Sequence, residues 1–204
     1  MTSITESQAK HSIGEGSLLD RWHSFPSLWS AIAYAQNSLV VETRKVDHFG
    51  EEVKSLLERE PFSRNAAGTV REAILQLADL PPAVLRDIED LAMRFAELTG
   101  SDHVRIRFEQ IVTNSCRKVH ADYTDVRLIT TYAGPGTQVA LNNNPRSQTL
   151  LDVPAGYVGL FKGRRYGANH EPCYHRSPPA ADLNVKRLVL VIDTQTFASD
   201  GECG

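Results

Sequence analysis

The sequence has no long apolar run. A helix that crosses a bilayer needs roughly 20 consecutive apolar residues, and no stretch of the 204 residues approaches that length. The opening MTSITESQAKHS is polar and lacks the apolar stretch of a secretory signal. These absences argue against membrane and secreted proteins, so we expect a soluble cytoplasmic protein with no membrane partner.

The sequence also lacks an excess of positive charge and a set of paired cysteines. It has 22 Lys and Arg against 25 Asp and Glu, with a formal net charge of -3, so we expect no nucleic-acid partner. Its three cysteines, Cys116, Cys173 and Cys203, are an odd number and include no CxxC pair. A disulfide framework is therefore not expected, and the thiols should be reduced.

Two common catalytic signatures are missing as well. The GPG turn at 134–136 is not followed by the Lys-Ser/Thr pair of a phosphate-binding loop. No Ser elbow of the α/β-hydrolase type is present. Nucleotide-loop and serine-hydrolase chemistry are excluded.

The first half of the sequence predicts mainly helices. Apolar residues recur at three- and four-residue steps over 17–36, broken by Pro26, which predicts two short helices. Residues 38–46 are rich in β-branched side chains and predict a strand. Three further amphipathic segments predict helices over about 48–59, 68–77 and 82–98.

The second half predicts short strands separated by Gly, Pro and Asn turns. The predicted strands are 103–112, 118–122, 126–132, 138–141, 150–153, 157–161, a segment around Tyr174, and 187–193. About eight such strands suit a barrel or jelly roll, with the helices packed on its outside. We therefore divide the chain into a disordered start (1–15), a mainly helical part (16–100), a β-barrel part (101–197) and a flexible tail (198–204).

Three side chains in the barrel part have the chemistry of a metal site. His120 and Asp122 are two residues apart on a predicted strand, so both should point to one face. His175 lies 53 residues after Asp122, far enough for the intervening strands to return the chain. Two imidazoles and one carboxylate on one side of a metal leave coordination positions open, as in non-haem Fe(II) oxygenases. The alternative is that His120 is an ordinary hydrogen-bonded strand residue and Asp122 a turn residue.

The thiols offer a rival site. Cys116 lies four residues before His120, and Cys173 lies two before His175. Thiolates joining imidazoles around one ion would favour Zn(II) over iron. His170 is a further possible ligand in this arrangement.

A resemblance adds to these patterns. The stretch CRKVHADYTDVRLITTYAGPGT, with LFKG and HRSPP, resembles a bacterial family known as domain of unknown function 1826. More distantly, His120, Asp122, the strand beginning at Arg127, PAGYVGLFKG and HRSPP followed by RLVLVID resemble Fe(II)- and 2-oxoglutarate-dependent oxygenases. That resemblance implies an α+β protein with a double-stranded β-helix, a cupin-like barrel. It also implies that His120, Asp122 and His175 hold Fe(II).

The oxygenase resemblance implies further roles around the co-substrate. Arg187, 12 residues after His175 at the start of the last predicted strand, would clamp the distal carboxylate of 2-oxoglutarate with its planar fork. Arg127, Thr130 and Tyr132 lie on one predicted strand, and we expect them to share a face and reach the same pocket. Ser177 could hydrogen-bond an oxyanion or simply form a turn.

Three hypotheses follow. The first is an Fe(II)- and 2-oxoglutarate-dependent oxygenase acting on a small molecule or a peptide. The second is a non-catalytic zinc-binding protein that senses, stores or passes the metal. The third is a β-barrel binding module without a metal. A homodimer stays open in each case, because exposed barrel edges pair.

Overall fold

The structure is a computed structural model that describes residues 29–45 and 49–195. Several predictions lie outside these residues. They are the segments 1–15 and 198–204, most of the two helices expected over 17–36, and Cys203. Within 17–36 the described part is a 3-10 helix, η1 (Trp29–Ala33).

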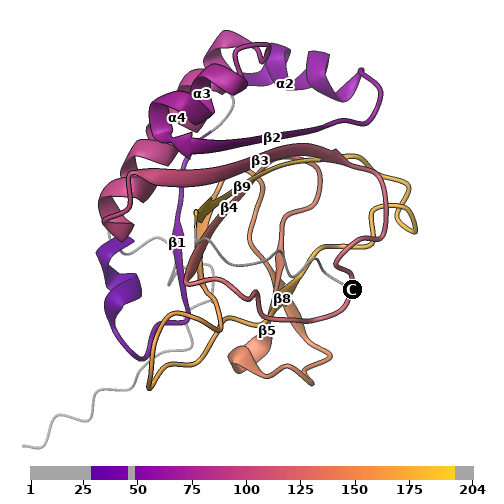
Figure 1. The fold of residues 1–204 in the computed structure, drawn as a ribbon. Coiled ribbons are helices and arrows are strands. Elements are labelled where there is room, and N and C mark those ends of the chain that lie inside the picture. Colours follow the sequence, from indigo (N-terminus) through magenta and orange to yellow (C-terminus); the bar gives the residue numbers. More distant parts are fainter. Residues whose placement is uncertain (1–28, 46–48, 196–204) are drawn as a thin grey trace, which may run out of the picture.

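Two antiparallel sheets form the barrel (Figure 1). The large sheet has the order β1-β7-β4-β9-β3-β2 and the small sheet the order β6-β5-β8. The strands are β1 (Leu39–Glu42), β2 (Ser63–Thr69), β3 (His103–Ile111), β4 (Val126–Ala133), β5 (Gln138–Ala140), β6 (Leu150–Asp152), β7 (Val158–Lys162), β8 (His175–Arg176) and β9 (Arg187–Thr194). This is the predicted α+β fold, a double-stranded β-helix with helices outside it.

Helices cover the outer face of the large sheet (Figure 1). They are α2 (Gly50–Leu57), α3 (Val70–Gln76) and α4 (Pro82–Thr99), and a short 3-10 turn, η3 (Leu141–Asn143), follows β5. On α4, Ile88, Leu91 and Phe95 are buried in the core, as their helical spacing predicts, and Val84 is buried with them. Across the described residues, no helix is long and apolar enough to cross a membrane.

Alternation along β3 shows how the large sheet divides. Val104, Ile106 and Phe108 are fully buried in the core cluster shared with the helices. The residues between them, such as Arg105 and Arg107, line a cavity on the opposite side. We call the two sides the helix face and the cavity face, and period-2 geometry assigns alternate residues of each strand to one or the other.

One strand prediction was wrong, and one strand was not predicted. Residues 118–122 do not form a strand, and His120 makes only an isolated bridge with His175. In the other direction, β2 was missed because SRNAAGT has few β-branched residues; its pairing with β3 along seven register positions makes it a strand.

The predicted helix over 68–77 begins later because of its cap. Thr69 and Glu72 form a reciprocal capping box, so α3 begins at Val70 and the preceding residues stay in β2. The part of the chain before Gly100 also contributes β1 and β2, the two edge strands of the large sheet.

Candidate metal centre

A backbone bridge brings the two histidines together. The His120 amide donates to the His175 carbonyl at 2.9 Å, and the His175 amide donates back at 2.8 Å. The two rings consequently lie with centroids 4.9 Å apart. Asp122 follows two residues after the bridge, and one ligand atom from each of the three side chains falls within 4.8 Å of the others.

Hydrogen bonds orient both imidazoles for metal binding. His120 Nδ1 lies 2.8 Å from the Lys118 carbonyl, and His175 Nδ1 lies 3.1 Å from the Cys173 carbonyl. Since a carbonyl only accepts, both Nδ1 atoms carry a proton, and each Nε2, the ring nitrogen turned toward Asp122, presents a lone pair to an ion once it has no proton. His120 Nε2 is 3.6 Å from Asp122 Oδ1, and His175 Nε2 is 3.3 Å from Asp122 Oδ2.

The carboxylate of Asp122 is charged and incompletely satisfied. Burial opposes its ionisation, but interactions with the rings of His120 and His175 and the charge of Arg127 outweigh burial and hold the pKa of Asp122 well below its ordinary value. Asp122 Oδ2 is buried and has no hydrogen-bond partner among the described residues. A metal ion would satisfy this oxygen and both Nε2 lone pairs at once, so the donor set fits a divalent cation.

Arg127 holds the other carboxylate oxygen. Its Nη1 contacts Asp122 Oδ1 at 2.7 Å, while its Nε and Nη2 each donate to one oxygen of Asp193 at 2.8 Å. Arg127 on β4 and Asp193 on β9 face each other in the sheet register. The pair orients Asp122 so that Oδ2 is the oxygen turned toward His175.

A second cationic group lies in the same cavity. The Arg187 side chain is fully buried, with Nε donating to the Pro135 carbonyl at 2.7 Å and Nη1 to Ser177 Oγ at 2.9 Å. Its Nη2 has no hydrogen-bond partner among the described residues. Burial lowers the pKa of Arg187 to about 10, although the nearby Glu109 and Cys116 act in the opposite direction. The guanidinium stays charged at neutral pH and can accept an anion.

A glycine allows the close approach that buries Arg187. Gly134 has a φ of +84°, and a Cβ there would lie 2.3 Å from the Lys186 carbonyl and 3.1 Å from Arg187 Cα. Only glycine adopts this conformation without strain and leaves this space. The GPG segment is thus a turn that lies directly against Arg187.

The cavity joins these groups. It has a volume of about 860 Å³ and lies between the cavity face of the large sheet and the small sheet. Its lining includes the three members of the cluster and four arginines, namely His120, Asp122, His175, Arg105, Arg107, Arg127 and Arg187.

Comparison with protein families decides the classification. Residues 35–193 match the model of a family described as "Protein of unknown function (DUF1826)". This chain belongs to that family. The match spans the whole barrel and the helices packed on it, as the resemblance of its motifs predicts. A comparison with curated proteins finds no match.

Solved structures show that this family member has the fold of known oxygenases. One similar structure is the dioxygenase for auxin oxidation in rice, with 13% identity, a TM-score of 0.55, and coverage of 78% of this chain and 74% of that one. Another is JOX2 in complex with 2OG, Fe and JA, with 10% identity, a TM-score of 0.52, and coverage of 76% and 67%. At such identity the likeness concerns the fold.

The prediction that Thr130 and Tyr132 share a pocket with Arg127 is wrong. Arg127 lies on the cavity face, but Thr130 is three residues away, an odd spacing that turns it to the other side. Thr130 Oγ1 accepts from Arg44 at 3.2 Å, and the Tyr132 hydroxyl donates to Asp87 within the helix-face core. Both residues are structural, and neither lines the cavity.

The thiols and His170 do not join the cluster. Among the described residues, the potential metal-binding group contains His120, Asp122 and His175 alone. Cys173 is fully buried, and burial raises the pKa of its thiol. His170 Nε2 hydrogen-bonds the Gly163 carbonyl at 2.9 Å. The sulfur-containing zinc site expected as a rival is therefore not assembled.

Sequence reasoning missed Asp193, Glu109 and the two β3 arginines as cavity residues. On β3, the alternation of the arginines and Glu109 with apolar residues gave a usable signal, since it predicts a polar face. The signal did not say what that face meets, because this depends on the register between β3, β9 and β4.

Proposed function

We propose that this protein is an Fe(II)- and 2-oxoglutarate-dependent oxygenase that hydroxylates an organic substrate. One observation carries the proposal. Two imidazole Nε2 atoms, an unsatisfied carboxylate oxygen of Asp122 and an unsatisfied guanidinium nitrogen of Arg187 belong to one cavity. Proteins of similar fold support it, since one is described as a dioxygenase and another as a complex with 2OG and Fe.

The metal would be held by His120 Nε2, His175 Nε2 and Asp122 Oδ2. Two nitrogens and one oxygen on a single side of the ion, with no thiolate among them, suit non-haem Fe(II) and leave positions for co-substrate and O₂. When bound, the metal and 2-oxoglutarate use O₂ to place one oxygen atom in a substrate C–H bond and the other in succinate, with loss of CO₂.

The co-substrate's distal carboxylate would bind Arg187 and Ser177. Ser177 follows His175 by two residues, and two residues of extended chain span at most about 7 Å. The Ser177 hydroxyl already touches the Arg187 guanidinium, so a short dicarboxylate can reach from the histidines to both groups. A carboxylate accepting from Nη2 would satisfy a buried donor whose isolation is costly.

Protein side chains would also orient the metal ligand Asp122 and limit the access of water. Arg127 keeps one oxygen of Asp122 engaged, so the other stays turned toward the ion. The side chains of Asp122 and His175 are each 5% exposed, whereas His120 is 27% exposed. Water is therefore excluded from one side of the cluster and the other side stays open to the cavity, where a substrate can enter.

The test is an anaerobic titration of the full chain with Fe(II) and then 2-oxoglutarate. We expect a weak visible charge-transfer band that saturates with 2-oxoglutarate. Arg187→Met should weaken 2-oxoglutarate binding by about 100-fold, since it removes a buried charge partner, while leaving Fe(II) binding intact. Ser177→Ala should give a smaller loss, and Arg86→Met, on the exposed side of α4, is the matched control.

The contrary outcome is equally specific. Tight zinc binding with no response to 2-oxoglutarate would reject the oxygenase and favour a non-catalytic zinc protein. Ligand binding that survives both His120→Ala and His175→Ala would favour a binding module without a metal.

A further inference from the structure

The end of β7 and the turn after it contact both of the chain segments that carry Asp122 and His175. We call these residues, 161–164, the 161–164 segment. It overlaps the LFKG motif at 160–163, which is part of the resemblance to the family. None of its four residues lines the cavity, so the contacts proposed for the metal and the co-substrate leave the motif without a role.

The first half of the 161–164 segment supports the ring of His175. The Phe161 ring lies on it, with centroids 4.8 Å apart and planes at 53°, and both side chains are buried. The Lys162 carbonyl accepts from the Cys173 amide at 2.8 Å. The Cys173 carbonyl in turn lies 3.1 Å from His175 Nδ1. The imidazole is therefore held by ring packing and by a hydrogen bond whose acceptor residue is itself anchored to β7.

The second half supports the backbone around Asp122, which lies outside any strand. The Arg164 amide donates to the Asp122 carbonyl at 2.8 Å, and Arg164 Nε donates to the Ala121 carbonyl at 3.2 Å. The Gly163 amide donates to the Asp125 carbonyl at 2.7 Å. These three hydrogen bonds take the place of a strand ladder, so they fix where the carboxylate of Asp122 begins.

A glycine allows the two segments to approach this closely. A Cβ at Gly163 would lie 2.0 Å from the Thr124 carbonyl oxygen and 2.6 Å from Thr124 Oγ1. Both distances are far shorter than a van der Waals contact. Any side chain at position 163 would push the backbone of Thr124 away from the turn, and the backbone of Asp122, two residues earlier, would move with it.

We propose that Phe161, Gly163 and Arg164 are positioning residues of the metal centre. They hold Asp122 and His175 so that Asp122 Oδ2 and His175 Nε2, which lie 3.3 Å apart, can bind one divalent ion. Bonds from such ions to nitrogen and oxygen are only about 2.0–2.2 Å long, so a small displacement of either ligand weakens binding. The inference rests on the metal-binding part of the proposed function and is independent of 2-oxoglutarate.

The experiment measures Co(II) binding to the full chain and to single variants. Co(II) is titrated under anaerobic conditions in competition with a chelator, and its visible absorption reports the geometry of its ligands. Gly163→Ala should weaken Co(II) affinity by about 10- to 100-fold, the usual cost of losing a contact that orients a ligand, and should alter the absorption band. Phe161→Leu should weaken it by about tenfold. Arg164→Met should give the smallest loss, because its backbone amide still binds Asp122.

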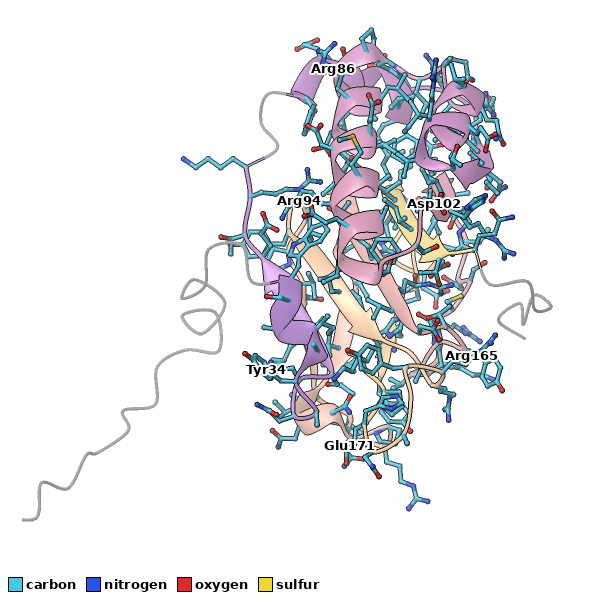
Figure 2. All side chains as sticks on the ribbon, turned by 60° about the vertical axis from the view of Figure 1, so that its left-hand side comes forward. Tyr34, Arg86, Arg94, Asp102, Arg165 and Glu171 are labelled. Carbon is cyan, nitrogen blue, oxygen red and sulfur yellow. The ribbon has the colours of Figure 1, made fainter. Side chains whose placement is uncertain are left out.

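Each variant has a matched control outside the proposed contacts. Gly68→Ala places a Cβ at a φ of +129° on β2, and Phe108→Leu removes a fully buried ring on the helix face. Arg165→Met removes the exposed side chain next to Arg164 (Figure 2). All three should keep the Co(II) affinity and spectrum, even where urea unfolding without metal shows a loss of stability. The same unfolding data show which variants fold, and Phe161→Leu and Arg164→Met test the proposal if Gly163→Ala does not.

Two outcomes overturn the inference. One is a Co(II) affinity and spectrum that stay unchanged in folded Gly163→Ala and in Phe161→Leu. The other is an equal loss of affinity in Gly68→Ala and Phe108→Leu, because metal binding would then follow general stability. If the unaltered chain binds Co(II) but Fe(II) gives no response to 2-oxoglutarate, the proposed function fails, while a selective loss in Gly163→Ala still supports the positioning role. An unaltered chain that binds no Co(II) would overturn both.

Discussion

The helix face and the cavity face of the large sheet come from alternate residues of the same strands and hold opposite chemistry. On β3, Ile106 and Phe108 are fully buried under the helices, whereas Arg107 between them reaches the cavity. The helix face buries apolar surface and stabilises the fold. The cavity face holds charge that a closed core would not tolerate without a partner. Stability and function can therefore be altered separately in neighbouring residues.

The largest contrast is expected between Phe108 and Arg107. Phe108→Ala deletes a fully buried ring that packs on Tyr132 and Phe62. It should lower the free energy of unfolding by about 3–5 kcal/mol, whereas Arg107→Gln should cost less than about 1 kcal/mol. Urea unfolding of both variants measures the difference. Equal losses would show that the two faces are not independent.

The next effect concerns the metal and Arg127. Arg127→Met removes the group that orients Asp122 and should weaken Co(II) or Zn(II) affinity by about 10- to 100-fold, the usual cost of losing such a contact. Asp193→Asn keeps the shape of the Arg127 partner and should give a smaller loss. Affinity is measured by competition with a chelator, with Arg86→Met as control. Unchanged affinity in Arg127→Met would refute the orienting role.

A smaller effect should follow at Tyr132, which lies on the helix face of β4. Burial raises the pKa of Tyr132 well above its ordinary value, so the hydroxyl stays protonated and donates to Asp87. Tyr132→Phe should cost about 1–3 kcal/mol of stability, since it leaves the buried carboxylate short of a donor. Metal and 2-oxoglutarate binding should not change. Weaker binding of the metal or of 2-oxoglutarate in Tyr132→Phe would show that Tyr132 contributes to the site.

The smallest effect is an expected lack of reaction. The raised pKa of Cys173 keeps it a neutral thiol at neutral and mildly alkaline pH, and only the thiolate is nucleophilic. Iodoacetamide at pH 8 should leave Cys173 unmodified in the folded protein and modify it after unfolding, as peptide mass spectrometry would report. Cys116, which is partly exposed at the cavity, is the internal comparison. Rapid labelling of Cys173 in the native protein would contradict its burial.

Sequence patterns predicted the parts that local chemistry determines. The apolar stripe of α4 and the β-branched runs of β4 and β9 were visible, and so was the triad His120, Asp122 and His175. β2 was not, since SRNAAGT becomes a strand only through its pairing with β3. The opposite error concerns residues 118–122, where a strand was predicted and only a single bridge forms.

Alternation alone does not predict which partners the charged residues of the cavity face bind. Arg127 was expected to meet the co-substrate, but Asp122 and Asp193 occupy its guanidinium. That result depends on which residue of β9 lies opposite Arg127, and register is set by tertiary packing. The pairing of Ser177 with Arg187 likewise joins groups ten residues apart through the turn between them.

The bridge between His120 and His175 has a consequence for how the protein responds to its ligand. One partner lies in irregular chain and the other in β8, which is only two residues long, so a single bridge joins these two segments. An ion bound by both rings would link these two segments and oppose local unfolding at this edge of the barrel. Amide hydrogen exchange at β8 should then slow as the ion binds, while exchange in β3 and β9 should barely change.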